Sequence, residues 1–153
     1  TNAKTQEAEG VKRACDCLKE AGVDCRYVLD SQAAVWEKYI FNCAYNVLTA
    51  HYRENVGELR ADAKKREEFR RLLQEAYDVG KAKGVHLEEE DIVRHQNRFE
   101  NKLADDATSS LQRDVEAGKH NTELETFCGY IVRVGRELGV DVSLTEKFYR
   151  MDS

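Results

Sequence analysis

The sequence contains no proline and only 9 glycines among its 153 residues. Proline breaks helix interiors, and glycine weakens them. Their scarcity, together with abundant Glu, Lys, Arg, Ala and Leu, therefore favours a mostly helical protein. The length suits one domain with a real core, or one domain plus a piece of another.

Long apolar runs and a one-sided charge balance are also absent. No run reaches the roughly 18 apolar residues that a membrane span needs, and the N-terminal residues lack the apolar core of a signal peptide. The 24 basic and 29 acidic residues are interspersed and give a net charge of −5, which argues against a nucleic-acid-binding surface. We therefore expect a cytoplasmic protein whose partners include no nucleic acid and no membrane.

Cysteine and histidine are too scattered to indicate a disulfide framework or a metal centre. The cysteines stand at Cys15, Cys17, Cys25, Cys43 and Cys128. Their odd number and irregular spacing favour reduced thiols, and Cys15-Asp16-Cys17 is not a CxxC redox motif. The four histidines lie far from any second ligand pair, so we expect no metal site.

The most apolar long stretch, residues 31–50, carries a regular polar series. Lys38, Asn42 and Asn46 recur every four residues, so on a helix they form one narrow stripe. Two interpretations remain open for this stripe. Either the asparagines tie neighbouring segments together while Lys38 reaches water, or the three side chains converge on a polar or anionic small molecule.

The remaining pattern predicts a series of helices around this stretch. Apolar residues recur with helical spacing over residues 5–21, 61–83, 88–106, 121–139 and 143–151. The inward residues expected for the helix over 61–83 are Phe69, Leu72, Leu73, Ala76, Tyr77 and Val79, and those for the helix over 121–139 are Leu124, Phe127, Cys128, Ile131, Val134 and Leu138. Residues 22–30 are β-branched and aromatic enough for a strand, although an extended linker is the alternative. Residues 56–59 break the pattern, and the hydroxyls of Thr108 and Ser109 predict a helix N-cap. A single strand without a partner resembles the end of an α/β domain.

Three segments together resemble the C-terminal domain of the ketopantoate reductase (2-dehydropantoate 2-reductase) family. They are VWEKYIFNCAYNVLTA with the following VGEL, then TSSLQRDVEAGK, then NTELETFCGYIVRVGRELGV. The resemblance implies an all-α, multi-helix domain of the 6-phosphogluconate dehydrogenase type over residues 31–153. It also implies that residues 1–30 are the last helix and strand of a Rossmann nucleotide-binding domain, with a linker.

The resemblance further implies roles for five residues. Lys38 would be the general acid for the C2 oxygen of a 2-oxo acid substrate, and Glu123 would engage the C4 hydroxyl and influence the charge of Lys38. Asn42, Asn46 and Ser110 would bind the substrate. NADPH would be held mainly by the nucleotide-binding domain, whose GxGxxG loop this sequence lacks, so we expect the chain alone to be inactive. A homodimer through the helical domain is a further expectation.

One departure and two alternatives accompany this interpretation. The segment from Asp114 to Glu123 is one residue longer than the family's usual spacing, so Asn121 could bulge and alter the reach of Glu123. The alternatives are a related 2-oxo acid reductase and a non-catalytic helical dimerisation module. A stripe sealed inside the core would support the module, whereas a stripe that meets Ser110 and Glu123 in an open cleft would support an enzyme.

Overall fold

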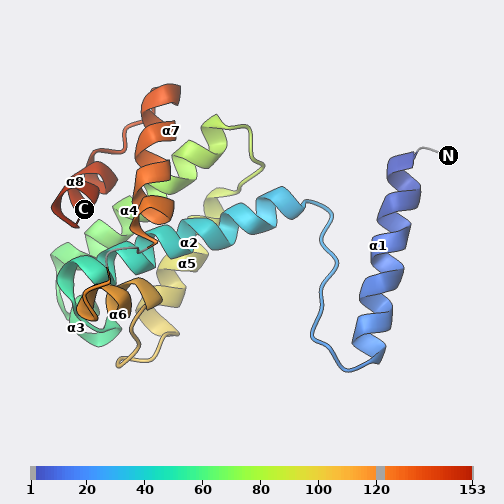
Figure 1. The fold of residues 1–153 in the computed structure, drawn as a ribbon, viewed down its shortest axis with the longest axis horizontal. Coiled ribbons are helices and arrows are strands. Elements are labelled where there is room, and N and C mark those ends of the chain that lie inside the picture. The colour runs from blue at the N-terminus through green and yellow to red at the C-terminus, as the bar shows by residue number, and fades with distance from the viewer. Residues whose placement is uncertain (1–2, 120–122, 153) are drawn as a thin grey trace.

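The computed structural model describes residues 3–119 and 123–152, and all regular secondary structure within them is helical (Figure 1). The helices are α1 (Ala3–Glu20), α2 (Ser31–Tyr52), α3 (Val56–Ala61), α4 (Ala63–Ala82), α5 (Glu89–Asn101), α6 (Ser110–Glu116), the π-turn η1 (Glu125–Gly129), α7 (Tyr130–Leu138) and α8 (Ser143–Asp152). This confirms the all-α prediction. No helix in this part of the chain is long and apolar enough to cross a bilayer.

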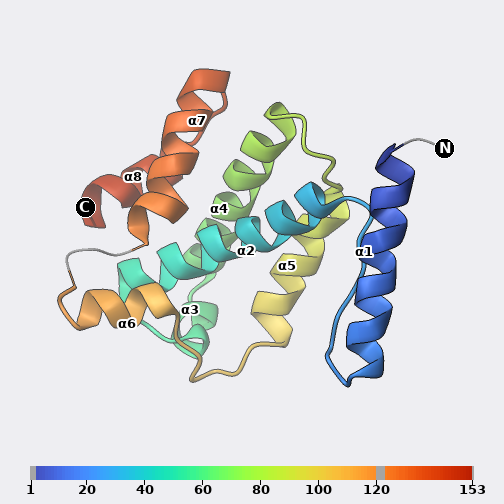
Figure 2. The same cartoon turned by 45° about the vertical axis from the view of Figure 1, so that its right-hand side comes forward.

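Helix α2 runs through the middle of the helical body (Figures 1 and 2). It packs against α4, α6 and η1, while α4 also contacts α5, α7 and α8. Two contacts of α2 matter for function, because α6 carries Ser110 and η1 begins two residues after Glu123. The fold therefore brings two of the three segments that carry the family resemblance, those of Ser110 and Glu123, to α2, the helix that carries the polar stripe.

The core consists of the apolar faces of these helices. At its centre, the Phe69 and Phe99 rings stack with centroids 4.0 Å apart, and Phe41 meets Phe69 edge-on at 6.1 Å. These three side chains come from α4, α5 and α2, so one aromatic cluster joins three helices. The predicted inward residues of α4 are all buried: Phe69, Leu72, Leu73, Ala76, Tyr77 and Val79.

The strand predicted for residues 22–30 is not formed. Residues 23–30 have neither helix nor strand, and in Figure 1 they connect α1 to the remaining helices as an extended segment. A strand needs a neighbour for its backbone hydrogen bonds, and no described residue provides one. The apolar residues Val11, Leu18, Val28 and Leu29 are exposed, with Leu29 at 93%.

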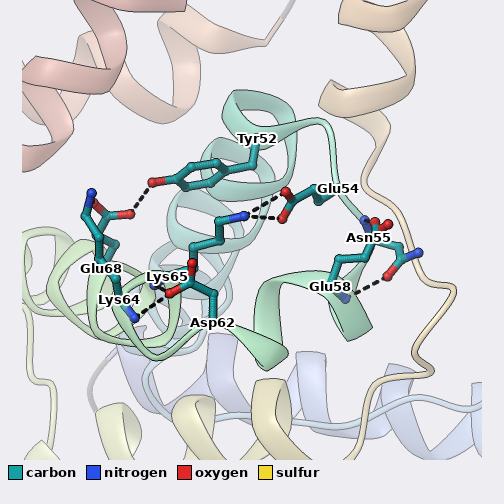
Figure 3. Close-up of polar contacts among 8 residues, drawn as sticks. All are labelled: Tyr52, Glu54, Asn55, Glu58, Asp62, Lys64, Lys65 and Glu68. Carbon is teal, nitrogen blue, oxygen red and sulfur yellow. Dashed lines mark hydrogen bonds and ion pairs between the residues drawn. The ribbon is translucent and has the colours of Figure 1, made fainter.

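Residues 56–59, predicted as a break, begin the short helix α3. Asn55 accepts a hydrogen bond from the Glu58 amide at 3.0 Å, and the Glu58 carboxylate accepts one from the Asn55 amide at 2.9 Å. This reciprocal capping box starts the helix and appears in Figure 3. Nearby, Lys65 donates to Glu54 at 2.7 Å, which fixes the chain between α2 and α4.

Two predictions about the helices were wrong: the end of α5 and the inward orientation of Leu138. Helix α5 stops at Asn101 rather than 106, because the Arg60 guanidinium binds the carbonyls of Glu100 at 2.9 Å and Leu103 at 2.7 Å. Leu138, predicted to face inward, is 44% exposed. It is the last residue of α7, and the chain turns away at Gly139, whose φ is 69°.

Helix α8 is attached to α4 by a buried carboxylate. Glu75, only 6% exposed, accepts hydrogen bonds from the backbone amides of Leu144 at 3.0 Å and Thr145 at 2.8 Å. The Thr145 hydroxyl donates to the same carboxylate at 2.7 Å. Glu75 thus satisfies amides at the start of α8 that have no partner within that helix, and its negative charge suits the helix dipole.

We predict that Glu75→Gln lowers the free energy of unfolding of this chain by about 1.5–3 kcal/mol. The amide keeps the shape but loses the charge and turns an NH₂ group toward a backbone donor. Urea unfolding followed by circular dichroism measures the change. Glu67→Gln on the exposed part of the same helix is the control, expected to change stability by no more than about 0.5 kcal/mol. Equal midpoints for the two variants would refute the assigned role of Glu75.

Candidate functional site

The polar stripe lies on α2 as the sequence predicts. The Asp30 side chain accepts a hydrogen bond from the Ala33 amide at 2.9 Å and caps the helix at its N-terminus. Along the stripe, exposure falls in one direction: Lys38 is exposed, Asn42 is partly buried and Asn46 is 5% exposed. The stripe is therefore open to solvent at the lysine and enters the protein at Asn46.

Asn46 joins α2 to α6. Its side-chain oxygen accepts hydrogen bonds from the Ser110 hydroxyl at 3.3 Å and the Leu111 amide at 3.4 Å. Its amide nitrogen donates to the Asn42 carbonyl at 3.1 Å. The structure thus brings together two predicted site residues that are 64 positions apart. It also shows that part of the Asn46 side chain serves to tie segments together, as the structural interpretation of the stripe expected.

The paired serines of α6 have different environments. Ser109 is buried and is the N-cap: its hydroxyl accepts from the Gln112 amide at 3.1 Å and lies 2.7 Å from the Thr49 hydroxyl. The prediction of a hydroxyl cap is confirmed for Ser109. Ser110 is exposed and turns its hydroxyl toward Asn46. Ser109 therefore holds the helix in place, and Ser110 is the serine available to a ligand.

The Lys38 ammonium makes no hydrogen bond and no ion pair among residues 3–119 and 123–152. By contrast, the Arg94 guanidinium pairs with Glu37, the residue before Lys38, at 2.7 Å. An exposed ammonium without a carboxylate beside it is free to bind an anionic or carbonyl-bearing ligand.

Glu123 is exposed and stands immediately before η1. Within the described part of the chain, no hydrogen bond or ion pair joins it to Lys38. Its backbone carbonyl accepts from the Phe127 amide at 3.0 Å, so its position follows that of the π-turn. The predicted bulge at Asn121 lies outside the described residues.

A tyrosine connects the stripe helix to this π-turn. The Tyr39 hydroxyl donates to the Thr126 carbonyl at 2.5 Å, and burial raises the pKa of Tyr39 above its ordinary value of 10. A surface pocket of about 370 Å³ lies at this junction and is lined by Tyr39, Glu125, Thr126, Tyr130 and Arg133. This junction could not be predicted from the sequence, because helical periodicity indicates neither a π-turn nor the hydrogen bond that fixes it.

The chemistry available at the site is that of a small-molecule binder. One face of α2 presents an ammonium at Lys38 and amides at Asn42 and Asn46, and α6 adds the hydroxyl of Ser110 through its bond to Asn46. Such groups can bind a carboxylate, polarise a carbonyl and hold a hydroxyl.

Comparison with known proteins identifies a matching family. Residues 30–151 match the family model described as the C-terminal part of ketopantoate reductase PanE/ApbA. A 2-dehydropantoate 2-reductase of Yersinia pestis is 30% identical over 136 residues, which are 89% of this chain and 43% of that protein.

Solved structures show the same fold. A PanE/ApbA family ketopantoate reductase from Ralstonia eutropha JMP134 is 27% identical, with a TM-score of 0.81 over 92% of this chain and 46% of that one. A dimeric ketopantoate reductase from Staphylococcus aureus has a TM-score of 0.82 at 23% identity, over 99% of this chain and 50% of that one. The present chain spans half or less of the length of these proteins.

Proposed function

Because this chain belongs to the ketopantoate reductase family, as its C-terminal part, we propose that it is the catalytic and substrate-binding domain of an NADPH-dependent 2-dehydropantoate 2-reductase. The observation that carries the proposal is the Lys38 ammonium, which pairs with no group among residues 3–119 and 123–152 and shares one face of α2 with Asn42 and Asn46. Ser110 meets this face through its bond to Asn46. A stripe that is open at the lysine and continuous with a second segment favours an enzyme over a sealed structural module.

We assign the proton transfer to Lys38. Reduction of a 2-oxo acid adds a hydride to C2 and a proton to the C2 oxygen. The Lys38 ammonium would lie beside this oxygen, stabilise the negative charge that develops on it and deliver the proton. Its lack of a fixed partner supports this role, because an ammonium already bound to a carboxylate would have to break that ion pair first.

The remaining groups would hold the substrate in register with Lys38. Ser110 would hydrogen-bond the substrate carboxylate, and the amides of Asn42 and Asn46 would bind its oxygen functions. Glu123 would accept a hydrogen bond from the C4 hydroxyl. Fixing both ends of the substrate places its C2 oxygen at the ammonium, and such positioning supplies a large share of enzymatic rate enhancement.

NADPH would supply the hydride when bound to a Rossmann nucleotide-binding domain of the kind that the family resemblance implies. We propose that residues 1–30 are the end of that domain and that residues 31–153 form the helical domain. The exposed apolar side chains of Val11, Leu18, Val28 and Leu29 support this division, since such residues are usually covered by packing.

We use "the longer protein" for the proposed reductase that contains both this chain and the nucleotide-binding domain. We further propose that the longer protein works in the cytoplasm as a homodimer. The support for the dimer is the Staphylococcus aureus neighbour, whose described form is dimeric. Size-exclusion chromatography with light scattering of the longer protein measures the assembly, and a monomer at micromolar concentration would rule the dimer out.

A panel of 2-oxo acids tests the proposed activity. The longer protein should oxidise NADPH with ketopantoate and form pantoate. We expect 3,3-dimethyl-2-oxobutanoate, which lacks only the C4 hydroxyl, to lower kcat/KM by at least about tenfold, because the partner of that hydroxyl is left unsatisfied. Preference for an aryl 2-oxo acid would instead indicate a related reductase. Failure to reduce any member of the panel would favour the dimerisation module.

A further inference from the structure

We infer that Tyr39 is a positioning residue for the reaction, because its hydroxyl fixes the π-turn η1, which directly follows the segment of Glu123, against the helix that carries Lys38. This inference rests on the proposed function. It adds a residue that touches neither substrate nor cofactor but determines how two catalytic side chains approach each other.

The Tyr39 side chain is well placed for this role. It directly follows Lys38 on α2, and its hydroxyl donates to the Thr126 carbonyl at 2.5 Å. Its ring meets Trp36 edge-on at 5.4 Å and Tyr130 edge-on at 6.1 Å, which restricts its rotation. Burial raises the pKa of Tyr39, so the hydroxyl keeps its proton and remains a donor throughout the working pH range.

The π-turn itself is a defined element with bonds on its other side. The Tyr130 amide donates to the Glu125 carbonyl, five residues back, as a π-turn requires. The Glu125 carboxylate accepts from Tyr149 at 2.6 Å and from Arg133 at 2.9 Å, which ties the turn to α8 and α7. It lies directly over Gly129, where an added methyl group would come within 2.4 Å of the carboxylate carbon.

The bond from Tyr39 therefore complements the bonds from Glu125. The Glu125 bonds hold the π-turn to α7 and α8, whereas the Tyr39 bond holds it to α2. Glu123 follows the turn, because its carbonyl is bonded to the Phe127 amide within it. Loss of the Tyr39 hydroxyl would release the α2 side of the turn and let Glu123 move away from Lys38.

Tyr39→Phe tests the inference, with Tyr52→Phe as a matched control. Tyr52 also lies on α2 and also donates its hydroxyl, to Glu68 at 2.6 Å (Figure 3), but it is the last residue of the helix. Burial raises the pKa of both tyrosines. The two variants thus remove the same group from similar surroundings.

In the longer protein, we expect Tyr39→Phe to lower kcat by roughly 10- to 100-fold with a smaller change in KM, since misplacement by about 1 Å can cost this much. Hydrogen exchange at the Phe127 and Tyr130 amides should also become faster, because these amides bond within the turn. Tyr52→Phe should leave kcat, KM and the exchange of these two amides as in the wild type.

Two results would overturn the inference, and they differ from each other. If the wild-type protein reduces ketopantoate but Tyr39→Phe matches Tyr52→Phe in kcat, in KM and in hydrogen exchange of the Phe127 and Tyr130 amides, Tyr39 does not position the site. If the wild-type protein reduces no 2-oxo acid, the proposed function itself is wrong, and the role of Tyr39 fails with it.

Discussion

Lys38→Ala is expected to lower kcat for ketopantoate reduction by about 10²- to 10⁴-fold, the usual contribution of a positioned general acid. The variant loses both the proton donor and the charge that stabilises the developing alkoxide. NADPH affinity should change little, because in the proposed function the dinucleotide is held mainly by the nucleotide-binding domain. Steady-state kinetics and fluorescence titration with NADPH separate the two effects.

Lys102→Ala is the matched control for Lys38→Ala. Lys102 is likewise an exposed lysine without an ion pair among the described residues, but it stands at the far end of α5. Its replacement should leave kcat unchanged. Wild-type turnover by the Lys38→Ala protein would exclude Lys38 as the general acid.

Phe69→Ala should destabilise this chain by about 3–5 kcal/mol, the usual cost of removing a buried phenylalanine from a core. Phe69 has no exposed surface, stacks on Phe99 and meets Phe41 edge-on. Its loss leaves a cavity where α2, α4 and α5 join. Because small domains have only about 5–15 kcal/mol of stability in total, the variant should unfold at a much lower urea concentration.

Urea unfolding followed by circular dichroism measures this loss. Val93→Ala serves as the control, since Val93 is 69% exposed and its replacement should change the free energy of unfolding by no more than about 0.5 kcal/mol. Similar unfolding midpoints for the two variants would show that the aromatic cluster does not stabilise the domain.

Periodicity predicted most of the helical architecture, because apolar residues at helical spacing identify which face is buried. It predicted the inward face of α4 in full. Periodicity gave wrong helix boundaries where a polar side-chain contact determines the start or end of a helix. The Arg60 guanidinium ends α5 early, and the capping box of Asn55 and Glu58 starts α3 where a break was predicted. The strand failed for another reason, since strand formation depends on a partner that the local sequence cannot provide.

The candidate site could be predicted only in part for the same reason. Helical spacing placed Lys38, Asn42 and Asn46 on one face, and the family resemblance supplied Ser110 and Glu123 as partners. That Ser110 rather than Ser109 faces Asn46 follows from the cap geometry of α6. Tyr39 could not be recognised, because its role depends on a carbonyl 87 positions away in a π-turn.

A single-turnover experiment tests the central claim most directly. The longer protein, saturated with NADPH and in excess over ketopantoate, is mixed rapidly while NADPH absorbance and pantoate formation are followed. The proposed site predicts one pantoate per NADPH consumed in the wild type, with almost no reaction over the same time for Lys38→Ala. Absence of pantoate from the folded, NADPH-bound wild type, or equal rates for the two proteins, would contradict the claim.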